Sequence, residues 1–420
     1  MPLEEGSALN SIRATARILQ APLPLVADEM TKDSKLPVYL DHQATTPVDA
    51  RVLQAMLPFF FEQYGNASSL HHAYGQAARA AVVKAREQVA RLFNVTPREV
   101  IFTSGATEAN NLAIKGCLAA APPGSHLIVN TAEHKSVLDV ATRLARRGVD
   151  LTILPVTPMG CVDPESVRAA IRPTTVLVSV MTGNNEVGSI NPIDEISRIC
   201  AERNVAIHSD LTQAVAHLAL DLNVLPVDLA SLSAHKIYGP KGVGALIKRR
   251  TSRQVPLEPQ LDGGGHENHL RSGTLAVPLI VGFGQACELI GQNRAADAGR
   301  LQELTVQLEQ GIRSQISETT LNGPPVTGDR LPGNLNLSFG GIDGDALLSR
   351  LKRIAVSSGA ACSAADPEPS HVLRAMGVPD PLVKASLRFG LGRSTTVADI
   401  QIAIEEVVRV VNELRSYRRN

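Results

Sequence analysis

The stretch "SLSAHKIYGPKG", Ser231–Gly242, is the part of the sequence from which the fold and the chemistry of this chain can first be inferred. A His-Lys pair follows small and apolar residues, and a Gly-Pro-Lys-Gly turn comes directly after it. A surface lysine needs no such setting. A reactive lysine does, because its amine becomes a nucleophile only when its surroundings favour the neutral form or when a carbonyl compound captures it. The stretch therefore predicts a sheltered, reactive Lys236.

The chain before this lysine alternates short apolar runs with amphipathic segments. Strands are predicted over 99–104, 126–131, 150–156, 174–181 and 205–210, and helices over 76–93, 134–148 and 192–204. Apolar strands that alternate with helices of this length indicate an α/β fold, with a largely parallel sheet covered on both faces. Ligands of such open sheets bind beyond the carboxyl ends of the strands, where most of the polar candidate residues lie.

After about Ile280 the pattern changes. A long helical region over roughly 280–316 leads into "NLNLSFGG" and "RIAVSSG", and a final helix is predicted over 397–414. This helix carries an apolar stripe at helical spacing, formed by Ile400, Ile404, Val407, Val408, Val411 and Leu414. The region predicts a second, smaller α+β lobe.

The composition is that of a globular enzyme. The chain has 420 residues and a formal net charge of +0, so a polyanion-binding surface is not expected. Tryptophan is absent and aromatics make up 3%, which argues against base stacking and therefore against direct nucleic-acid binding. No apolar run approaches the roughly 20 residues that cross a bilayer. An odd number of widely spaced cysteines fits a reducing compartment and predicts a cytoplasmic protein.

Residues 1–36 differ from the rest of the chain. They contain no acidic residue from Gly6 to Ala27, and Arg13 and Arg17 lie one helical turn apart, a pattern that weakly resembles an organelle transit peptide. Two early glutamates and the "APLPL" break count against that interpretation. We therefore expect residues 1–36 to form a flexible extension.

Two motifs suggest a phosphorylated ligand with a cationic ring. "TSGATEANN" (103–111) follows a predicted strand and opens a helix, a turn that suits one phosphate, although an ordinary helix cap explains it equally well. Asp210, in "HSDLTQ", ends another strand and is placed to pair with a buried cation or to cap a helix. Together with Lys236 these parts suit pyridoxal 5'-phosphate: the lysine binds it covalently, the carboxylate pairs with the ring nitrogen and the turn holds the phosphate. Ser233 and His235 would add hydrogen bonds to that phosphate.

Cys362 lies in "AVSSGAACSAADPEPSHVL" (355–373) among Ser, Gly and Ala. A lone cysteine is usually a buried structural thiol, but this one has no large apolar neighbours. The small residues and the prolines that follow predict a mobile, exposed loop with a reactive thiol. The other four cysteines, in helical or apolar surroundings, are expected to be inert: Cys117, Cys161, Cys200 and Cys287.

Two further motifs contain candidate ligands. His266 and His269, in "GGGHENHLRSGT" (263–274), have no evident third partner, so no metal site is predicted. Arg388 and Arg393, in "SLRFGLGR", would either clamp a carboxylate or brace the smaller lobe.

The motifs together resemble the cysteine desulfurases of the class V aminotransferase group, which are fold-type I pyridoxal phosphate enzymes. The resemblance extends from "VYLDHQATTPVD" (38–49) to about Leu414, and the segment around Cys362 resembles the long flexible loop of members that pass sulfur to separate acceptor proteins. It is strongest in "FTSGATEANNLAIKG", "AEHKSVLD", "NNEVGSINPI", "SAHKIYGPKGVGAL", "GGGHENHLRSGTL", "AVSSGAACSA" and "RFGLGR".

The resemblance implies a domain organisation and an activity. A large cofactor-binding domain with a mostly parallel seven-stranded sheet is expected over 52–295. A smaller α+β domain, carrying the cysteine loop, is expected from 37–51 and 296–420. The enzyme would convert L-cysteine to L-alanine and leave a persulfide on Cys362, for delivery to an acceptor such as an iron–sulfur scaffold protein.

The resemblance also implies a role for each candidate residue. Lys236 would hold the cofactor and later move the substrate α-proton, and His134 would stack on the ring and act in acid–base steps. Asp210 would pair with the ring nitrogen and Gln213 with the phenolic oxygen. The phosphate ligands would be Ala106, Thr107, Ser233 and His235, with Thr274 reaching across from the partner subunit of a homodimer. The substrate would be oriented by Asn66, Asn185 and Arg388.

Three alternatives stay open at this stage. A selenocysteine lyase on the same scaffold depends less on a protein thiol, so the prominence of Cys362 favours desulfuration. An aminotransferase-like enzyme would have no use for a loop thiol. A protein that mainly docks to a sulfur-accepting scaffold would not need the complete set of cofactor residues.

Overall fold

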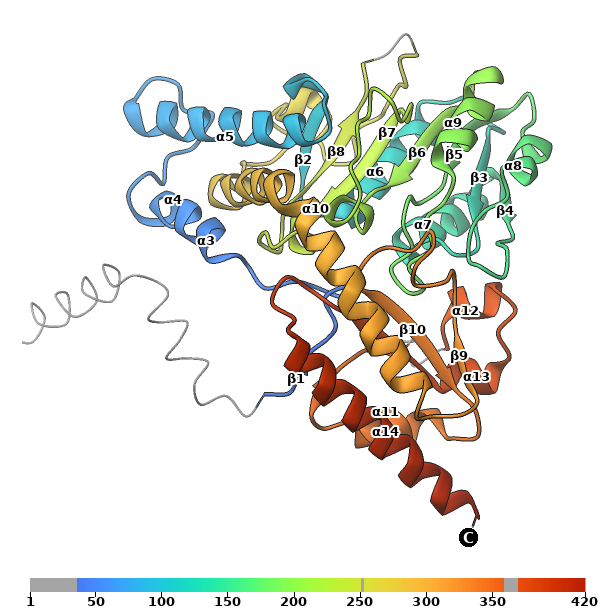
Figure 1. Cartoon of the computed structure of the whole chain (residues 1–420). Coiled ribbons are helices and arrows are strands. Elements are labelled where there is room, and N and C mark those ends of the chain that lie inside the picture. The colour runs from blue at the N-terminus through green and yellow to red at the C-terminus, as the bar shows by residue number, and fades with distance from the viewer. Residues whose placement is uncertain (1–35, 251–252, 359–368, 420) are drawn as a thin grey trace, which may run out of the picture. The chain divides into compact units, whose positions relative to one another are not determined.

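The computed structural model describes residues 36–250, 253–358 and 369–419 (Figure 1). The predicted N-terminal extension, apart from its last residue, and Cys362 lie outside the described residues. The contacts within the chain separate Met1–Pro37 from one compact unit, Val38–Asn420.

A seven-stranded sheet forms the centre of this unit. Its strands are β2 (Val100–Thr103), β3 (His126–Asn130), β4 (Asp150–Leu154), β5 (Thr175–Ser179), β6 (Ala206–Asp210), β7 (Leu229–Ser233) and β8 (Gly244–Lys248). Their order across the sheet is β2-β8-β7-β6-β5-β3-β4. Strands β3 to β7 pair in parallel, whereas β8 runs antiparallel to both β7 and β2. The predicted mostly parallel sheet is confirmed.

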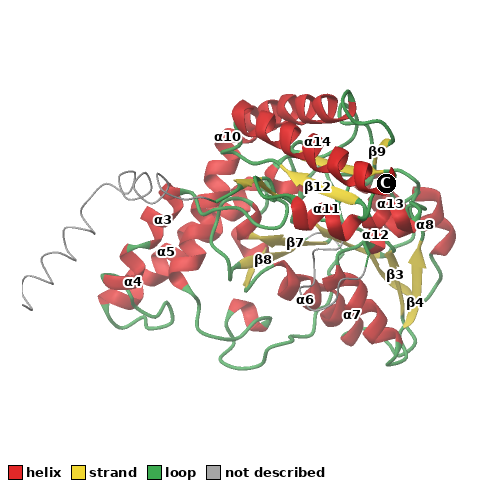
Figure 2. Ribbon diagram, turned by 90° about the horizontal axis from the view of Figure 1, so that it is seen from below, coloured by secondary structure: helices red, strands yellow, loops and turns green. Residues whose placement is uncertain are grey.

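Helices cover both faces of the sheet because its buried strands are apolar on both sides. In β3, Leu127 and Val129 face a cluster that includes helices α6 and α7, whereas Ile128 between them faces the cluster that includes α5, α9 and the first half of α10. Figure 2 shows α6 and α7 next to each other below β7 and β8. These helices are α5 (Ala73–Leu92), α6 (Ala106–Ala119), α7 (Lys135–Ala145), α8 (Pro164–Ala170), α9 (Ile193–Glu202) and α10 (Val277–Arg313).

The smaller sheets lie in the other part of the unit. Strands β12 (Ser386–Gly390), β10 (Asn334–Phe339) and β9 (Thr319–Leu321) form an antiparallel sheet, and β1 (Val38–Tyr39) pairs in parallel with β11 (Ile354–Ala355). The remaining helices are α3 (Ala50–Met56), α4 (Pro58–Phe61), α11 (Gly344–Arg350), α12 (His371–Ala375), α13 (Asp380–Lys384) and α14 (Val397–Arg419).

Helix α10 joins the two hydrophobic cores. Its first half, around Phe283 and Ile290, packs into the core of the seven-stranded sheet. Its second half, around Leu304 and Leu308, packs with α14 on the smaller sheet, and Figure 1 shows the helix passing from one to the other. The predicted stripe on α14 belongs to this second core. The proposed division into domains at 52–295 stays a prediction.

No helix in the described ranges combines the length and the apolar character needed to cross a bilayer.

Candidate active site

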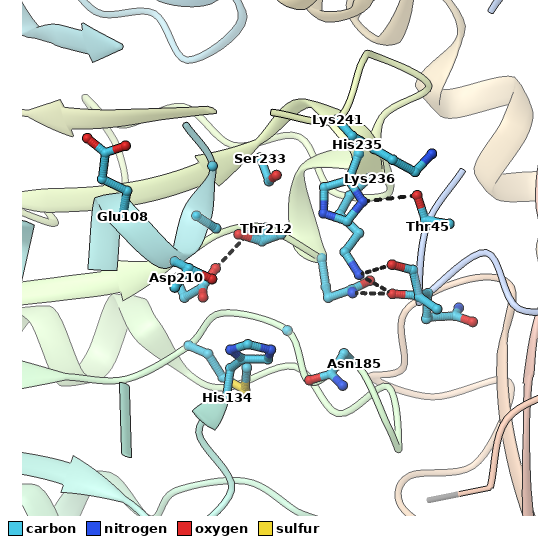
Figure 3. A pocket seen from close by; sticks show the side chains of 18 of the residues that line it. Thr45, Glu108, His134, Asn185, Asp210, Thr212, Ser233, His235, Lys236 and Lys241 are labelled. Atoms are coloured by element: carbon cyan, nitrogen blue, oxygen red, sulfur yellow. Dashed lines mark hydrogen bonds between the residues drawn. The ribbon is translucent and has the colours of Figure 1, made fainter. Parts of the chain in front are cut away.

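A cavity of about 510 Å³ lies at the carboxyl edge of the seven-stranded sheet. Figure 3 shows side chains from several strand ends turned toward this common space, among them Asp210, His134 and Lys236. The position agrees with the rule for ligand sites of open α/β sheets. The structure brings ten of the predicted residues to its lining: Ala106, Thr107, His134, Asn185, Asp210, Gln213, Ser233, His235, Lys236 and Arg388.

The turn before α6 forms an anion cradle on one side of the cavity. Gly105, the N-cap of α6, has φ 153° and ψ 179°, a conformation that essentially only glycine adopts. Gly244, the first residue of β8, packs tightly against this turn: a Cβ there would lie 2.7 Å from the Cα of Gly105. The turn places the N-terminus of a 14-residue helix, with its first N–H groups and positive dipole end, at the cavity beside the Ser233 hydroxyl.

Lys236 ends the short 3₁₀ turn that follows β7, and its side chain extends into the cavity. Its Nζ donates to the backbone carbonyl of Ala44 at 2.8 Å and also to that of Gln43. The residue is half-buried. The preceding residue, His235, has its pKa lowered to about 4 by burial and by the charges of Lys236 and Lys241, so its ring is neutral at neutral pH.

Asp210 is the last residue of β6 and is buried at the cavity wall. One carboxylate oxygen accepts the backbone N–H of Thr212 at 2.9 Å, as Figure 3 shows, and the other accepts the side-chain N–H of Asn110 at 2.8 Å. These two donors hold the carboxyl group in a fixed position. The site therefore offers a fixed negative charge to a cationic ring nitrogen.

His134 lies between β3 and α7 and caps that helix. Its Nδ1 accepts the backbone N–H of Ser136 at 3.1 Å. Burial lowers the pKa of His134; the nearby Asp210 opposes this effect, and Lys236 and His371 add to it. The imidazole is therefore neutral at neutral pH and able to accept or relay a proton.

Arg388, in the middle of β12, is 4% exposed and brings a cation to the cavity. Its Nη2 donates to Asp41 at 2.8 Å and its Nη1 to the backbone carbonyl of Asn185 at 3.3 Å. Its buried Nε has no hydrogen-bond partner in the described part of the chain. A carboxylate in the cavity would satisfy this group.

Asn66 and Thr274 do not line this cavity and are both exposed. Their segments are nevertheless linked through His266, whose Nε2 lies 3.0 Å from the Ser68 hydroxyl and whose Nδ1 accepts the Gly273 N–H at 3.3 Å. The described residues include no cluster of His, Cys, Asp or Glu side chains suited to a metal ion.

Sequence reasoning missed several lining residues. Gln43, Ala44 and Thr45 come from the segment before α3, and Thr45 hydrogen-bonds the ring of His235. Thr212 also lines the cavity, and its buried hydroxyl has no partner among the described residues. Its position between Asp210 and Gln213 was the available signal. Nothing in "HQAT" by itself indicated a backbone contact with a lysine that lies almost two hundred residues later.

The site fits pyridoxal 5'-phosphate. The cradle before α6 matches a phosphate, Asp210 matches a protonated ring nitrogen, and the amine of Lys236 enters the same cavity. The unpartnered Thr212 hydroxyl and Arg388 Nε are polar groups that a ligand would satisfy. The fold and the site thus define a fold-type I enzyme of the pyridoxal phosphate class.

The chain belongs to the cysteine desulfurases of the aminotransferase class V family: residues 38–402 match the family model described as Aminotransferase class-V. The cysteine desulfurase IscS of Anaeromyxobacter sp. (strain Fw109-5) is 50% identical over 382 residues, which cover 91% of this chain and 94% of that protein. A solved NifS-like protein is 35% identical with a TM-score of 0.83, and the match covers 90% and 100% of the two chains. The structure of SspA in complex with cysteine is 34% identical with a TM-score of 0.75, covering 84% and 98%. The resemblance inferred from the motifs is confirmed.

Proposed function

We propose that this cysteine desulfurase converts L-cysteine and its own Cys362 thiol to L-alanine and a Cys362 persulfide. The observation that carries the proposal is the convergence of Lys236, Asp210 and Arg388 on one cavity, since these groups suit an amine, a ring cation and an amino-acid carboxylate. SspA, which is similar to this chain, has been solved in complex with cysteine.

Bound pyridoxal phosphate would supply an electron-accepting ring that makes the α-proton of the amino acid acidic. The cradle of Ala106 and Thr107, with Ser233 and His235, would hold the phosphate. Asp210 would keep the ring nitrogen protonated, and Gln213, whose amide now donates to the Gln43 carbonyl at 3.0 Å, would turn to the phenolic oxygen.

Arg388 and Asn185 would orient the substrate, with the free Nε of Arg388 directed to the carboxylate. Lys236 would then take the α-proton, because its amine enters the same cavity, where it donates to the backbone carbonyl groups of Gln43 and Ala44. His134, neutral at neutral pH, would serve the accompanying proton transfers.

Sulfur transfer would be carried out by Cys362 as a thiolate, because the neutral thiol is a poor nucleophile. A new S–S bond forms between its Sγ and the substrate sulfur while the substrate C–S bond breaks. The bonding pair stays with the substrate carbon, which takes up protons and leaves as alanine. The atoms balance: cysteine and a thiol yield alanine and a persulfide.

A homodimer is part of the proposal. Four of the few aromatic residues of the chain are exposed within 60–74, and Phe61 and Tyr64 are 64% and 66% exposed. We name this the aromatic patch: Phe60, Phe61, Tyr64 and Tyr74. Exposed aromatic side chains in such density are typical of protein interfaces. Ser68, within the same segment of the chain, is linked through His266 to Gly273, next to Thr274, which would contact the phosphate in the partner's cavity.

The acceptor of the persulfide sulfur would be a separate protein, and an iron–sulfur scaffold is the acceptor we propose. The proposal rests on the resemblance of the segment around Cys362 to long-loop members of the family. A cytoplasmic location is proposed because a persulfide cycle needs thiols that stay reduced.

The test compares wild type with Cys362→Ser under reducing conditions and measures alanine and sulfide from L-cysteine. Wild type is expected to release both in equal amounts, and the variant to lose activity by at least about a hundredfold while the cofactor spectrum is kept. Cys161→Ser, at a cysteine outside the cavity lining, is the matched control and should behave as wild type.

Sulfide release by Cys362→Ser at the wild-type rate would overturn the persulfide mechanism. A selenocysteine lyase or a simple C–S lyase would then explain the site better, and the same assay with L-selenocysteine would distinguish these two activities.

A further inference from the structure

A directed chain of hydrogen bonds connects His134 with Asp210 beneath the cavity. The ring Nδ1 of His134 lies 2.8 Å from the Ser136 hydroxyl. The Asn110 side-chain nitrogen lies 2.8 Å from that same hydroxyl and 2.8 Å from a carboxylate oxygen of Asp210. Asn110 lies on α6 and Ser136 on α7, so the chain bridges two helices that pack against each other.

The direction of each hydrogen bond follows from the chemistry of its partners. An ionised carboxylate only accepts, so Asn110 must turn its NH₂ group toward Asp210. The second hydrogen of that NH₂ group is donated to the Ser136 hydroxyl. The single hydrogen of Ser136 is then available for Nδ1 of His134, which also accepts the Ser136 backbone N–H. Two donors on Nδ1 require a lone pair there, so the neutral ring carries its hydrogen on Nε2.

We propose that Asn110 and Ser136 are positioning residues that fix His134 as the Nε2–H tautomer and connect its ring to the carboxylate of Asp210. The inference deepens the proposed function, because His134 and Asp210 would face the cofactor. The ring would then present the N–H of Nε2 to the cavity. Protonation at Nδ1 would leave the hydroxyl and the backbone N–H of Ser136 without their acceptor.

The burial of Asn110 argues against a merely structural role. The side chain is fully buried, yet its carbonyl oxygen has no partner in the described part of the chain. An unsatisfied buried acceptor is unfavourable, and an apolar residue of similar shape would avoid it. Asn110 is therefore best explained by its two donated hydrogen bonds, which only an amide in this position supplies.

The charged groups around His134 must be considered in any titration. Asp210 and Asp139 favour the protonated ring, whereas Lys236 and His371 disfavour it. The buried carboxyl group of Glu133 precedes His134, and the His371 ring bonds the Glu133 backbone carbonyl at 2.9 Å. A change at Ser136 leaves all these groups in place, so it isolates the contribution of the hydroxyl.

The test is ¹⁵N NMR of the cofactor-loaded protein labelled at histidine, with the His134 signal assigned by its loss in His134→Gln. Wild type is expected to show a protonated Nε2 and an unprotonated Nδ1. In Ser136→Ala and Asn110→Leu the pKa of His134 should rise by roughly half a unit to one unit, and the Nδ1–H tautomer should become detectable.

Two controls separate this effect from a general disturbance. Ser136→Thr keeps the hydroxyl and should restore the wild-type spectrum. Ser197→Ala removes another buried serine hydroxyl, one that donates within α9, and should leave His134 unchanged.

A proton on Nδ1 in wild type, or unchanged His134 signals in a folded Ser136→Ala, would overturn the inference. The spectra do not depend on turnover, so they can fail while desulfuration is observed, or hold while it is not.

Discussion

Asp41 and Arg388 lie 347 positions apart in the sequence, yet a carboxylate oxygen of Asp41 accepts a hydrogen bond from Nη2 of Arg388 at 2.8 Å. The other oxygen of Asp41 accepts the Ser357 hydroxyl at 2.8 Å. Ser357 and Arg388 also exchange two backbone hydrogen bonds, of 2.7 and 3.2 Å. One aspartate thus fixes both the guanidinium in the cavity and the strand segment beside it.

Asp41→Asn should weaken substrate binding more than turnover. The amide removes the charge that orients Arg388 and so weakens a charge-assisted hydrogen bond. The loss should raise the KM for L-cysteine on the order of tenfold. Steady-state kinetics of alanine formation measure it. Asp228→Asn is the matched control. Asp228 is a buried aspartate that does not line the cavity, and its carboxylate pairs with Arg253 at a distance of 3.0 Å. The KM of this variant for L-cysteine should be unchanged. An unchanged KM for Asp41→Asn would show that Arg388 is held without Asp41.

Thr274 should act across the proposed dimer. Lys236→Ala and Thr274→Ala should each lose most activity at limiting cofactor. After subunit exchange between the two variants, half of the dimers are mixed, and each mixed dimer has one site with Lys236 from one subunit and Thr274 from the other. The mixture should therefore recover about a quarter of the wild-type activity. The measurement is alanine formation before and after exchange. Thr274 acting within its own subunit would give no such recovery, and Phe61→Glu with Tyr64→Glu should prevent dimers and recovery together.

Cys362 should be the cysteine that alkylates first in the native protein. Burial raises the pKa of Cys117 to about 11 and that of Cys200 to about 12, and it raises the pKa of Cys161 and Cys287 as well, so few thiolates form at these sites. Iodoacetamide at mildly alkaline pH followed by peptide mass spectrometry should label Cys362 alone at short times. Early labelling of any of the other four would contradict their predicted inertness.

Glu133 should make stability depend on pH. Burial, and to a lesser degree the charge of Asp210, raises its pKa from 4.5 to about 8. Between these pH values the folded protein keeps a proton that the unfolded chain releases, so stability falls as pH rises through this window. Glu133→Gln removes the titration, and the Tm of the variant should therefore rise relative to wild type between about pH 5 and 8. Thermal unfolding at several pH values measures this difference; Glu62→Gln, at an exposed glutamate, should show none.

Much of the fold could be predicted from local patterns. The predicted helix over 76–93 corresponds to α5, Ala73–Leu92, and the strand predicted over 205–210 corresponds to β6, Ala206–Asp210. Strands β7 and β8 were not predicted. In β7, "LASLS", apolar residues alternate with small polar ones, although every residue of the strand is buried. Polar residues that alternate along a strand normally mark the face that meets solvent, but neither face of β7 meets solvent.

The sequence by itself determined the family and predicted the chemistry of the site. Asp210 ends a predicted strand, the turn before α6 follows another, and Lys236 was identifiable from the small and apolar residues before it and the Gly-Pro-Lys-Gly turn after it. Parallel strands end at the same edge of a sheet, which brings such residues together. The tertiary structure alone decided which distant residues complete it. The carbonyl of Ala44 at Lys236, the pairing of Asp41 with Arg388 and the link from Asn110 to Ser136 depend on strand order and helix packing. The positions of these residues in the sequence do not reveal that they are in contact, because they come together only when the hydrophobic faces of helices and sheet pack.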